Sequence, residues 1–179
     1  MKLRPGYLSC ITAALMGMAV SFLSHGADDV SISFTGSVRA AACKVSSGSD
    51  QTVRLGDVST TYFGNPGDVS PATPFSIGID CPSDGPVNAT VTFSGTAASD
   101  PALLALDAGG SEVAHGVAVR INEADAITQV KLNTPSATKA LVAGGNSLQF
   151  AAQYQALVDR PQITGGVANA TAQFTINYP

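Results

Sequence analysis

Three cysteines and two histidines have the most distinctive side-chain chemistry in this 179-residue chain. Cysteines form disulfides in oxidising compartments, and imidazoles bind metals or transfer protons near neutral pH. Which chemistry is open to the chain depends on which of these five residues remain in the mature protein. The N-terminal sequence decides that question.

The N-terminus has the features of a secretory signal peptide over residues 1–26. Lys2 and Arg4 precede an apolar stretch, and Ser24 and Gly26 supply small residues at the positions that a signal peptidase reads. A transmembrane anchor is the alternative, but the stretch is short, contains small polar residues and is followed at once by two aspartates. We therefore expect cleavage after Gly26, which changes the net charge from -4 to -6 because two basic residues are lost.

Cleavage removes Cys10 and leaves an even number of cysteines. Cys43 and Cys81 would be exported to an oxidising compartment, where a single disulfide is expected. Two buried free thiols are the alternative, which would suit a cytosolic protein and conflicts with the signal peptide. In the chain-entropy model, closing this loop stabilises the fold by about 4 kcal/mol.

The mature sequence has no recognisable catalytic arrangement. His115 is its only histidine, so several imidazoles cannot combine in a metal centre, and we expect a surface or turn histidine. The densest carboxylate groups, Asp28-Asp29 and Glu123-Ala124-Asp125, are interpreted as solvent-exposed acids. Motifs of the types G-x-S-x-G, G-x-x-x-x-G-K and G-x-G-x-x-G do not occur. We expect a protein that is not an enzyme and uses no cofactor or metal.

The composition argues against a nucleic-acid partner. Only 12% of the residues are charged, acidic residues outnumber basic ones, and the isoelectric point is near 4.8. Binding to nucleic acid depends on basic groups that neutralise phosphates, and this chain has no excess of them. At 45% hydrophobic, the length suits one domain with an ordinary core.

Strict alternation of apolar and polar residues predicts β-strands in most of the mature chain. Turn clusters rich in glycine, proline, asparagine and aspartate separate the alternating runs, and only residues 99–104 suggest a helical turn. Short strands without helices to cover a parallel sheet indicate an all-β sandwich. The alternating runs cover residues 75–80, 89–94, 117–121, 148–154 and 168–178.

Both ends of the mature chain alternate with unusual regularity. The C-terminal run covers residues 168–178, and the N-terminal run covers residues 30–38 with almost no charge. One interpretation makes both runs edge strands of the chain's own sheets. The other makes them templates for pairing with another chain, because an uncharged alternating strand at a free terminus is suited to it.

The order of several short blocks resembles the subunits of chaperone-usher pili, close to type 1 fimbrial major pilins. An alternating segment leads to Gly36, and the first cysteine follows seven residues later. At the C-terminus, Gly166 is fourteenth from the end and Tyr178 is second, which is the family's spacing. The blocks between them are similar as well: residues 53–58, 74–81, 91–95 and 116–121.

The resemblance implies an incomplete immunoglobulin-like β-sandwich that lacks its last strand and is completed by a donor strand from a partner. Residues 27–38 would form the N-terminal donor-strand extension, and residues 39–179 the pilin domain. The donor side chains would be those of Val30, Ile32, Phe34, Gly36 and Val38. The edge that contacts the chaperone and accepts the donor strand would include Gly166, Ala172, Phe174, Ile176 and Tyr178.

The function implied by this resemblance is that of a structural fimbrial subunit. It would be captured by a periplasmic pilus chaperone, pass an outer-membrane usher and polymerise by donor-strand exchange with neighbouring pilin subunits in a homopolymer. The fibre would support cell adhesion at the surface of a Gram-negative bacterium. The alternatives are a minor adaptor subunit of the same pilus and a free secreted immunoglobulin-like binding domain.

Overall fold

The computed structural model describes Thr35 and residues 42–48, 50–109 and 112–179. The internal contacts divide the chain into residues 1–37 and 38–179, and every element below belongs to the second unit. Within the described residues the regular elements are seven strands and two short 3-10 helices, η1 (Thr60–Tyr62) and η2 (Arg160–Gln162). The expectation of an all-β fold is confirmed.

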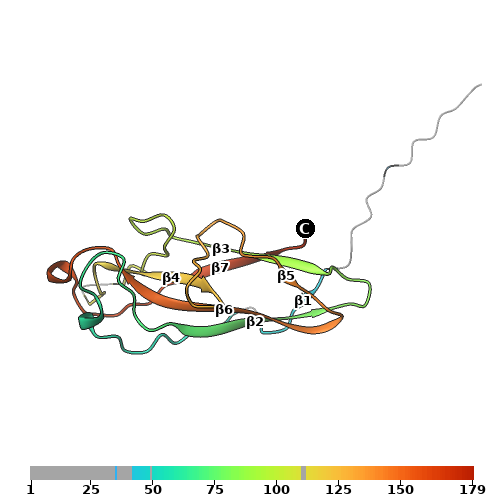
Figure 1. Ribbon diagram of the computed structural model, residues 1–179, viewed down its shortest axis with the longest axis horizontal. Helices are drawn as coiled ribbons and strands as arrows, with labels where there is room; N and C mark the ends of the chain where they lie inside the picture. Colours follow the sequence, from blue (N-terminus) through green and yellow to red (C-terminus); the bar gives the residue numbers. More distant parts are fainter. Residues whose placement is uncertain (1–34, 36–41, 49, 110–111) are drawn as a thin grey trace, which may run out of the picture. The chain divides into compact units, whose positions relative to one another are not determined.

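The strands form two antiparallel sheets, which Figure 1 shows with their labels. The four-stranded sheet has the order β1 (Lys44–Val45), β2 (Thr73–Cys81), β6 (Gly144–Ala156) and β4 (Val117–Glu123). The three-stranded sheet has the order β5 (Lys139–Ala140), β3 (Asn88–Gly95) and β7 (Ala172–Asn177).

Alternation in sequence becomes alternation in burial along the central strands. In β2, Ile77 and Ile79 are buried, and in β3 Ala89, Val91 and Phe93 are buried, while their neighbours face outward or are partly covered. This is the arrangement of strands with one face on a core. The predicted runs 75–80, 89–94, 117–121 and 148–154 all fall within strands.

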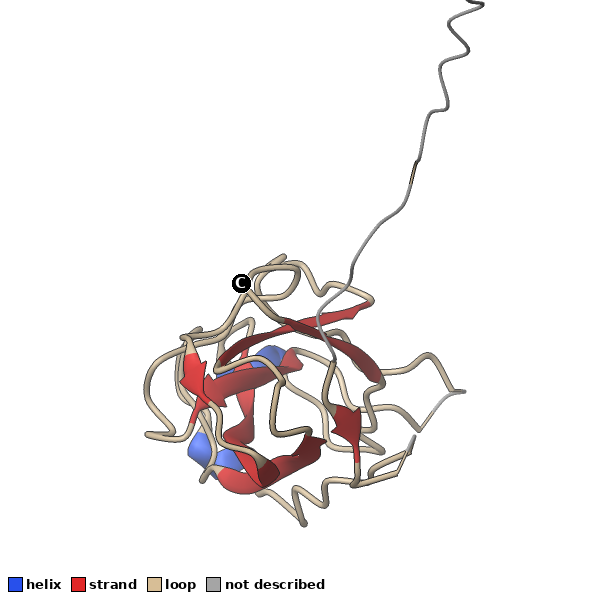
Figure 2. Ribbon diagram, turned by 90° about the vertical axis from the view of Figure 1, so that its right-hand side faces the viewer, coloured by secondary structure: helices blue, strands red, loops and turns tan. Residues whose placement is uncertain are grey.

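Three phenylalanines join the two sheets in the centre of the core. Phe75 of β2 and Phe150 of β6 come from one sheet, and Phe93 of β3 comes from the other. The rings of Phe93 and Phe150 meet edge to face at 5.1 Å between centroids, and Phe75 lies 6.2 Å from Phe93. These contacts establish a sandwich, whose opposed sheets are visible in Figure 2.

The C-terminal strand is shorter than its alternation predicts. It begins at Ala172, although Ala168 and Ala170 already have one half-buried face. Before the strand, the backbone of residues 169–171 is bonded to Asp107: the carboxylate accepts from Thr171 N–H, and Asp107 N–H donates to Asn169 O. Because these backbone groups are already hydrogen-bonded to Asp107, the hydrogen-bond ladder between β7 and β3 starts only at Ala172.

The helical turn predicted for residues 99–104 is present as a single hydrogen-bonded turn that does not extend into a helix. Asp100 does accept a hydrogen bond from Ala102 N–H, as a helix cap would, but Leu103 N–H bonds back to Asp100 O and closes a single turn. Leu104 then forms a bridge with Val119 of β4. Leu103 and Leu104 are both buried, so burial of this pair in the core ends the turn before a helix can develop.

Candidate functional site

Strand β7 is an edge strand with one apolar face. It pairs with β3 from Thr90 opposite Asn177 to Gly95 opposite Ala172, and no described strand pairs with its other side. Phe174 and Ile176 of β7 and Tyr178 just beyond it are half-buried, whereas the residues between them are exposed. An edge of this kind offers unpaired backbone groups next to partly exposed apolar side chains.

The apolar side chains of β7 belong to a larger set of partly exposed side chains on the same core. They pack against the buried cluster of both sheets without being covered themselves. We call them the open-edge set: Cys43, Leu55, Phe75, Leu106, Tyr154, Ala170, Phe174, Ile176 and Tyr178. In a fully covered sandwich, core-facing side chains of this size would be buried, so the set marks where the core is open to solvent.

A second stretch of unpaired backbone contributes to the open-edge set. Over residues 51–58, no backbone–backbone hydrogen bond to another described residue is formed, and the stretch is not part of either sheet. Its side chains still alternate, with Val53 and Leu55 half-buried, and Gln51 donates from its amide to Ser76 O at 2.9 Å. The stretch is amphipathic and has no strand partner among the described residues.

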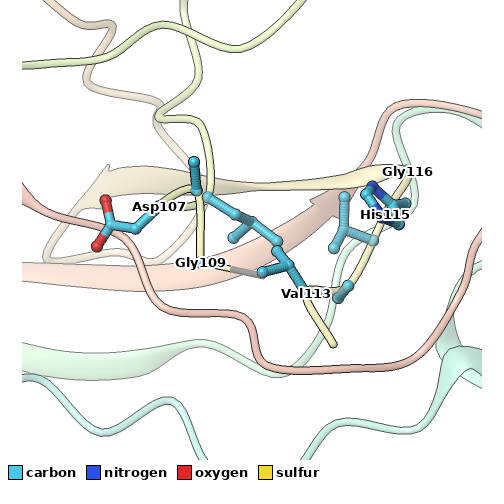
Figure 3. A pocket seen from close by; sticks show the side chains of 9 residues that line it. Asp107, Gly109, Val113, His115 and Gly116 are labelled. Atoms are coloured by element: carbon cyan, nitrogen blue, oxygen red, sulfur yellow. The ribbon is translucent and has the colours of Figure 1, made fainter. Parts of the chain in front are cut away.

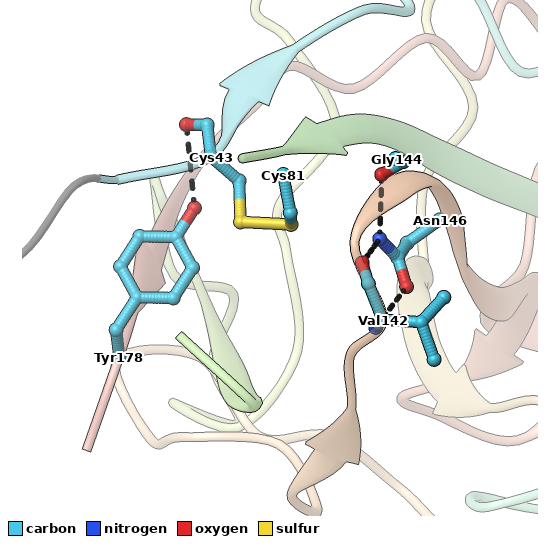
Figure 4. Close-up of a disulfide and its surroundings, with 6 residues drawn as sticks. All are labelled: Cys43, Cys81, Val142, Gly144, Asn146 and Tyr178. Carbon is cyan, nitrogen blue, oxygen red and sulfur yellow. Dashed lines mark hydrogen bonds between the residues drawn. A yellow bond between two sulfur atoms is a disulfide. The ribbon is translucent and has the colours of Figure 1, made fainter. Parts of the chain in front are cut away.

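The disulfide lies beside the C-terminal end of β7. Cys43 and Cys81 are joined, as expected, which ties the residue before β1 to the last residue of β2. The Tyr178 hydroxyl donates a long hydrogen bond of 3.5 Å to Cys43 O (Figure 4). Partial burial raises the pKa of Tyr178, so the hydroxyl is a neutral donor at physiological pH.

Tyr154 is a second tyrosine of the open-edge set that is held by the backbone. Its hydroxyl donates to Ala168 O at 2.7 Å, and burial raises its pKa. The bond fixes the chain that leads into β7 against strand β6. The open edge is therefore built on rigid contacts with the core.

Gly166 lies upstream of β7, where backbone meets backbone. A Cβ atom at this position would lie 2.7 Å from Ala114 N and 2.8 Å from the carbonyl carbon of Val113, closer than real Cβ contacts. Val167 N–H donates to Glu112 O, and Ala114 N–H donates to Val167 O, so the two segments run side by side. Only glycine fits this approach.

The structure thus brings together only part of the predicted edge. Phe174, Ile176 and Tyr178 share the half-buried face, Ala172 is exposed at the start of β7, and Gly166 lies against residues 112–114. The predicted donor residues Val30, Ile32, Phe34, Gly36 and Val38 lie outside the described residues.

Several members of the open-edge set were not identified from the sequence. Phe75 and Tyr154 alternate like ordinary core residues of their strands, and Leu55 and Leu106 lie outside regular strands. Alternation reports which face a side chain is on, not whether another strand covers that face. No sequence signal at these positions separates an open core from a closed one.

A surface hollow of about 360 Å³ lies next to the start of β4 (Figure 3). Its lining includes Asp107, Val113 and His115. The Asp107 carboxylate accepts from the backbone and hydroxyl of Thr171, so it closes a loop, and His115 is exposed as expected. The Asp107 side chain therefore has a structural role in this hollow.

The interpretation of Glu123 as a solvent-exposed acid is wrong. Glu123 ends β4 and is 8% exposed; it forms an ion pair with Lys139 of β5 and accepts from Ala137 N–H at 2.7 Å. A carboxylate is buried here because a cation and a backbone donor satisfy it. Asp125 is exposed, and hydrogen bonds from the Thr128 side chain and from Ile127 and Thr128 N–H lower its pKa.

Two absences concern the described residues alone. They contain no group of three or more histidine, cysteine or acidic side chains placed to hold a metal ion. In the same part of the chain, no helix has the length and apolar character needed to cross a membrane.

Comparison with known proteins identifies the family. The model of the family described as Fimbrial protein matches residues 32–179. The chain is 38% identical to the type 1 fimbrial protein A chain of Salmonella typhi over 177 residues, which covers 93% of this chain and 94% of that protein. The chain therefore belongs to the Fimbrial protein family, and it is a subunit of a chaperone-usher pilus, a structural and non-enzymatic class.

Solved structures agree with this assignment. The antigen and type I fimbria protein of Burkholderia pseudomallei has 34% sequence identity and a TM-score of 0.58, covering 81% of this chain and 94% of that one. The P pilus rod subunit PapA has 20% identity and a TM-score of 0.60, covering 78% of this chain and all of PapA. The second comparison supports the immunoglobulin-like pilin fold alone.

Proposed function

We propose that this chain is a structural subunit that polymerises by donor-strand exchange with further copies of itself. The observation that carries the proposal is the open edge of β7. Unpaired backbone and half-buried Phe174, Ile176 and Tyr178 together form a template for one further strand. The strand that would fill it is residues 30–38 of a neighbouring copy.

The donor segment has the composition that such an edge requires. Val30, Ile32 and Phe34 share one face of an extended strand and carry no charge, and Gly36 and Val38 continue that face. Burying three large apolar side chains contributes about 1.5 to 3 kcal/mol each. Main-chain hydrogen bonds add to this, so the joint between subunits would be non-covalent and slow to dissociate.

The open edge must be protected before assembly. A core that is exposed to solvent aggregates in a free subunit. We infer that a periplasmic chaperone covers the edge first, using Gly166, Ala172, Phe174, Ile176 and Tyr178, and that an outer-membrane usher then directs assembly. The subunit would be exported after cleavage of residues 1–26 and reach the cell-surface fimbria, where the fibre supports adhesion.

Gly36→Asn tests the exchange step. In phase with the donor side chains, Gly36 would face the acceptor edge at a point where only a residue without Cβ fits. We expect the variant to fold and to bind its chaperone but not to polymerise, measured as fibres by electron microscopy and as polymers in native gels. Ser37→Asn, which places the same side chain on the opposite face, should polymerise normally.

Normal polymerisation of Gly36→Asn would contradict the placement of the donor segment. The purified mature chain separates the remaining alternatives. A free immunoglobulin-like binding domain would be a stable monomer without a chaperone, whereas a pilin should aggregate alone and be soluble in the chaperone complex. A minor adaptor would leave fibres on cells that lack this gene; a major subunit would not.

A further inference from the structure

One end of the sandwich carries the disulfide and two exposed loops. We call it the cysteine end and define it by the Cys43–Cys81 disulfide and the loops 82–87 and 141–143. Cys81 is paired with Gly144, and Leu141 N–H donates to Val87 O at 2.8 Å. The two loops are therefore adjacent, and Figure 4 shows Val142 near the disulfide.

Two apolar side chains project from these loops into solvent. Val87 is 69% exposed and Val142 is 66% exposed, although the neighbouring Leu141 is 6% exposed and anchors its loop in the core. Single exposed apolar residues are common on protein surfaces. Two on adjacent loops at the same end form a small apolar surface.

The loop that carries Val142 is held rigid by one side chain. The Asn146 amide accepts from Val142 N–H at 2.9 Å and donates to Val142 O at 2.7 Å and to Gly144 O at 2.9 Å. A loop closed in this way loses little conformational entropy when it makes a contact. Val142 is displayed in a fixed position.

The length of chain before Cys43 indicates what covers this end. Only four residues separate Val38 from Cys43, so the two Cα atoms are at most about 18 Å apart. Cys43 itself is fixed to the end of β2 by the disulfide. If residues 30–38 lie on a neighbouring copy, the body of that copy must lie close to the cysteine end.

We propose that Val87 and Val142 form a contact surface for the neighbouring copy of this chain that receives residues 30–38. The inference rests on donor-strand exchange and adds a second contact between the same two copies. The donor strand binds the neighbouring copy, and Val87 and Val142 pack against the body of that copy. Both valines are uncharged, so removal of apolar surface from water drives the contact.

The test compares fibres of the double variant Val87→Asp/Val142→Asp with fibres of Ile127→Asp. Ile127 is 76% exposed on the loop after β4, so it controls for adding a charge to an exposed apolar site. Subunit release is measured in a fixed concentration of guanidinium chloride. The double variant should release subunits at least about tenfold faster than wild type, and Ile127→Asp within about twofold, because a tenfold change corresponds to about 1.4 kcal/mol.

Equal release rates for the double variant and the control would overturn the inference. If the double variant forms no fibres, a second measurement on wild type decides. Hydroxyl-radical labelling of Val87 and Val142 should fall in fibres relative to the chaperone complex, while labelling of Ile127 should not. Equal labelling in both states, or protection already complete in the chaperone complex, would contradict a contact between copies.

Failure of donor-strand exchange itself would give a different set of results. If donor-strand exchange is wrong, wild-type chains form no fibres or Gly36→Asn forms them normally, whatever happens at the cysteine end. If exchange is right and only this inference is wrong, wild type polymerises, Gly36→Asn does not, and the double variant behaves like Ile127→Asp.

Discussion

Gly166 has no Cβ, and this allows the chain that leads into β7 to lie against residues 112–114. Its backbone lies so close to residues 112–114 that an added methyl group would have to displace main chain. We expect Gly166→Ala to lower the free energy of unfolding by about 2 kcal/mol, since overpacking against a backbone cannot be relieved by a side-chain rotation. Guanidinium unfolding followed by circular dichroism measures the change.

Gly165→Ala is the matched control. Its added Cβ would meet no atom within 4 Å, and its backbone does not have a positive φ. We expect no loss of stability, or a slight gain from reduced flexibility of the unfolded chain. An equal loss of stability in both variants would show that the close backbone approach at Gly166 does not cause the destabilisation.

Asp68 makes a pH-dependent contribution to the free energy of unfolding. Backbone hydrogen bonds from Asn65 and Gly64 lower its pKa below the ordinary value of 3.8. The folded state thus favours the charged form, so the stabilisation is complete above about pH 4 and is lost as pH falls through the lowered pKa. Asp68→Asn should be less stable than wild type at pH 7, and the difference should vanish in acid.

Urea unfolding of both proteins between pH 7 and pH 2 measures this difference. A difference that stays constant over the whole range would mean that the carboxylate charge is not involved. The amide of the variant keeps one acceptor, so the comparison isolates the charge from the loop geometry.

At the scale of elements, β7 is expected to be the strand that binds the chaperone. Phe174 is opposite Phe93 of β3 and has its half-buried ring on the core face. We expect Phe174→Asp to abolish the chaperone complex and lead to degradation in the periplasm, because a charge on this face cannot be desolvated without a partner. Immunoblots and co-purification with the chaperone measure both effects.

Thr175→Asp is the control for that strand, since Thr175 is exposed on its other face. It adds the same charge to the same strand and should leave subunit levels near those of wild type. Normal subunit levels in Phe174→Asp would remove β7 from the proposed chaperone site.

The strands themselves could be predicted from the sequence, but their partners could not. Period-two alternation located the central parts of β2, β3, β4 and β6, because one buried face is a local property of a strand. The pairing of β2 with β6, whose paired residues are 63 or more positions apart in the sequence, depends on the whole chain. Short strands such as β1 and β5 carry no periodic signal in two residues.

Only the C-terminal part of the candidate site could be predicted from the sequence. Phe174, Ile176 and Tyr178 alternate on one face, and that face is half-buried in the fold. Leu55 and Leu106 could not be identified, since tertiary packing brings them to the same core from outside the strands. Glu123 was misinterpreted because its ion-pair partner, Lys139, is 16 residues away in the chain.

For the molecule as a whole, we expect formation of the Cys43–Cys81 disulfide to follow export. We expect mass spectrometry of the mature protein to show a chain that begins at Ala27, lacks Cys10 and contains Cys43 joined to Cys81. Intact mass and a non-reducing peptide map provide the measurement. Retention of Cys10, or two free thiols in the exported protein, would contradict the proposed route.

The Cys43–Cys81 disulfide also determines how the domain would carry mechanical tension. A pull on the peptide before Cys43 would otherwise load β1, which has only two residues and would peel from the sheet early. Through the disulfide, the load passes directly to the end of β2, which is paired with β6 over nine residues. Because a force along those strands must shear many hydrogen bonds at once, the domain should resist extension from its N-terminal side.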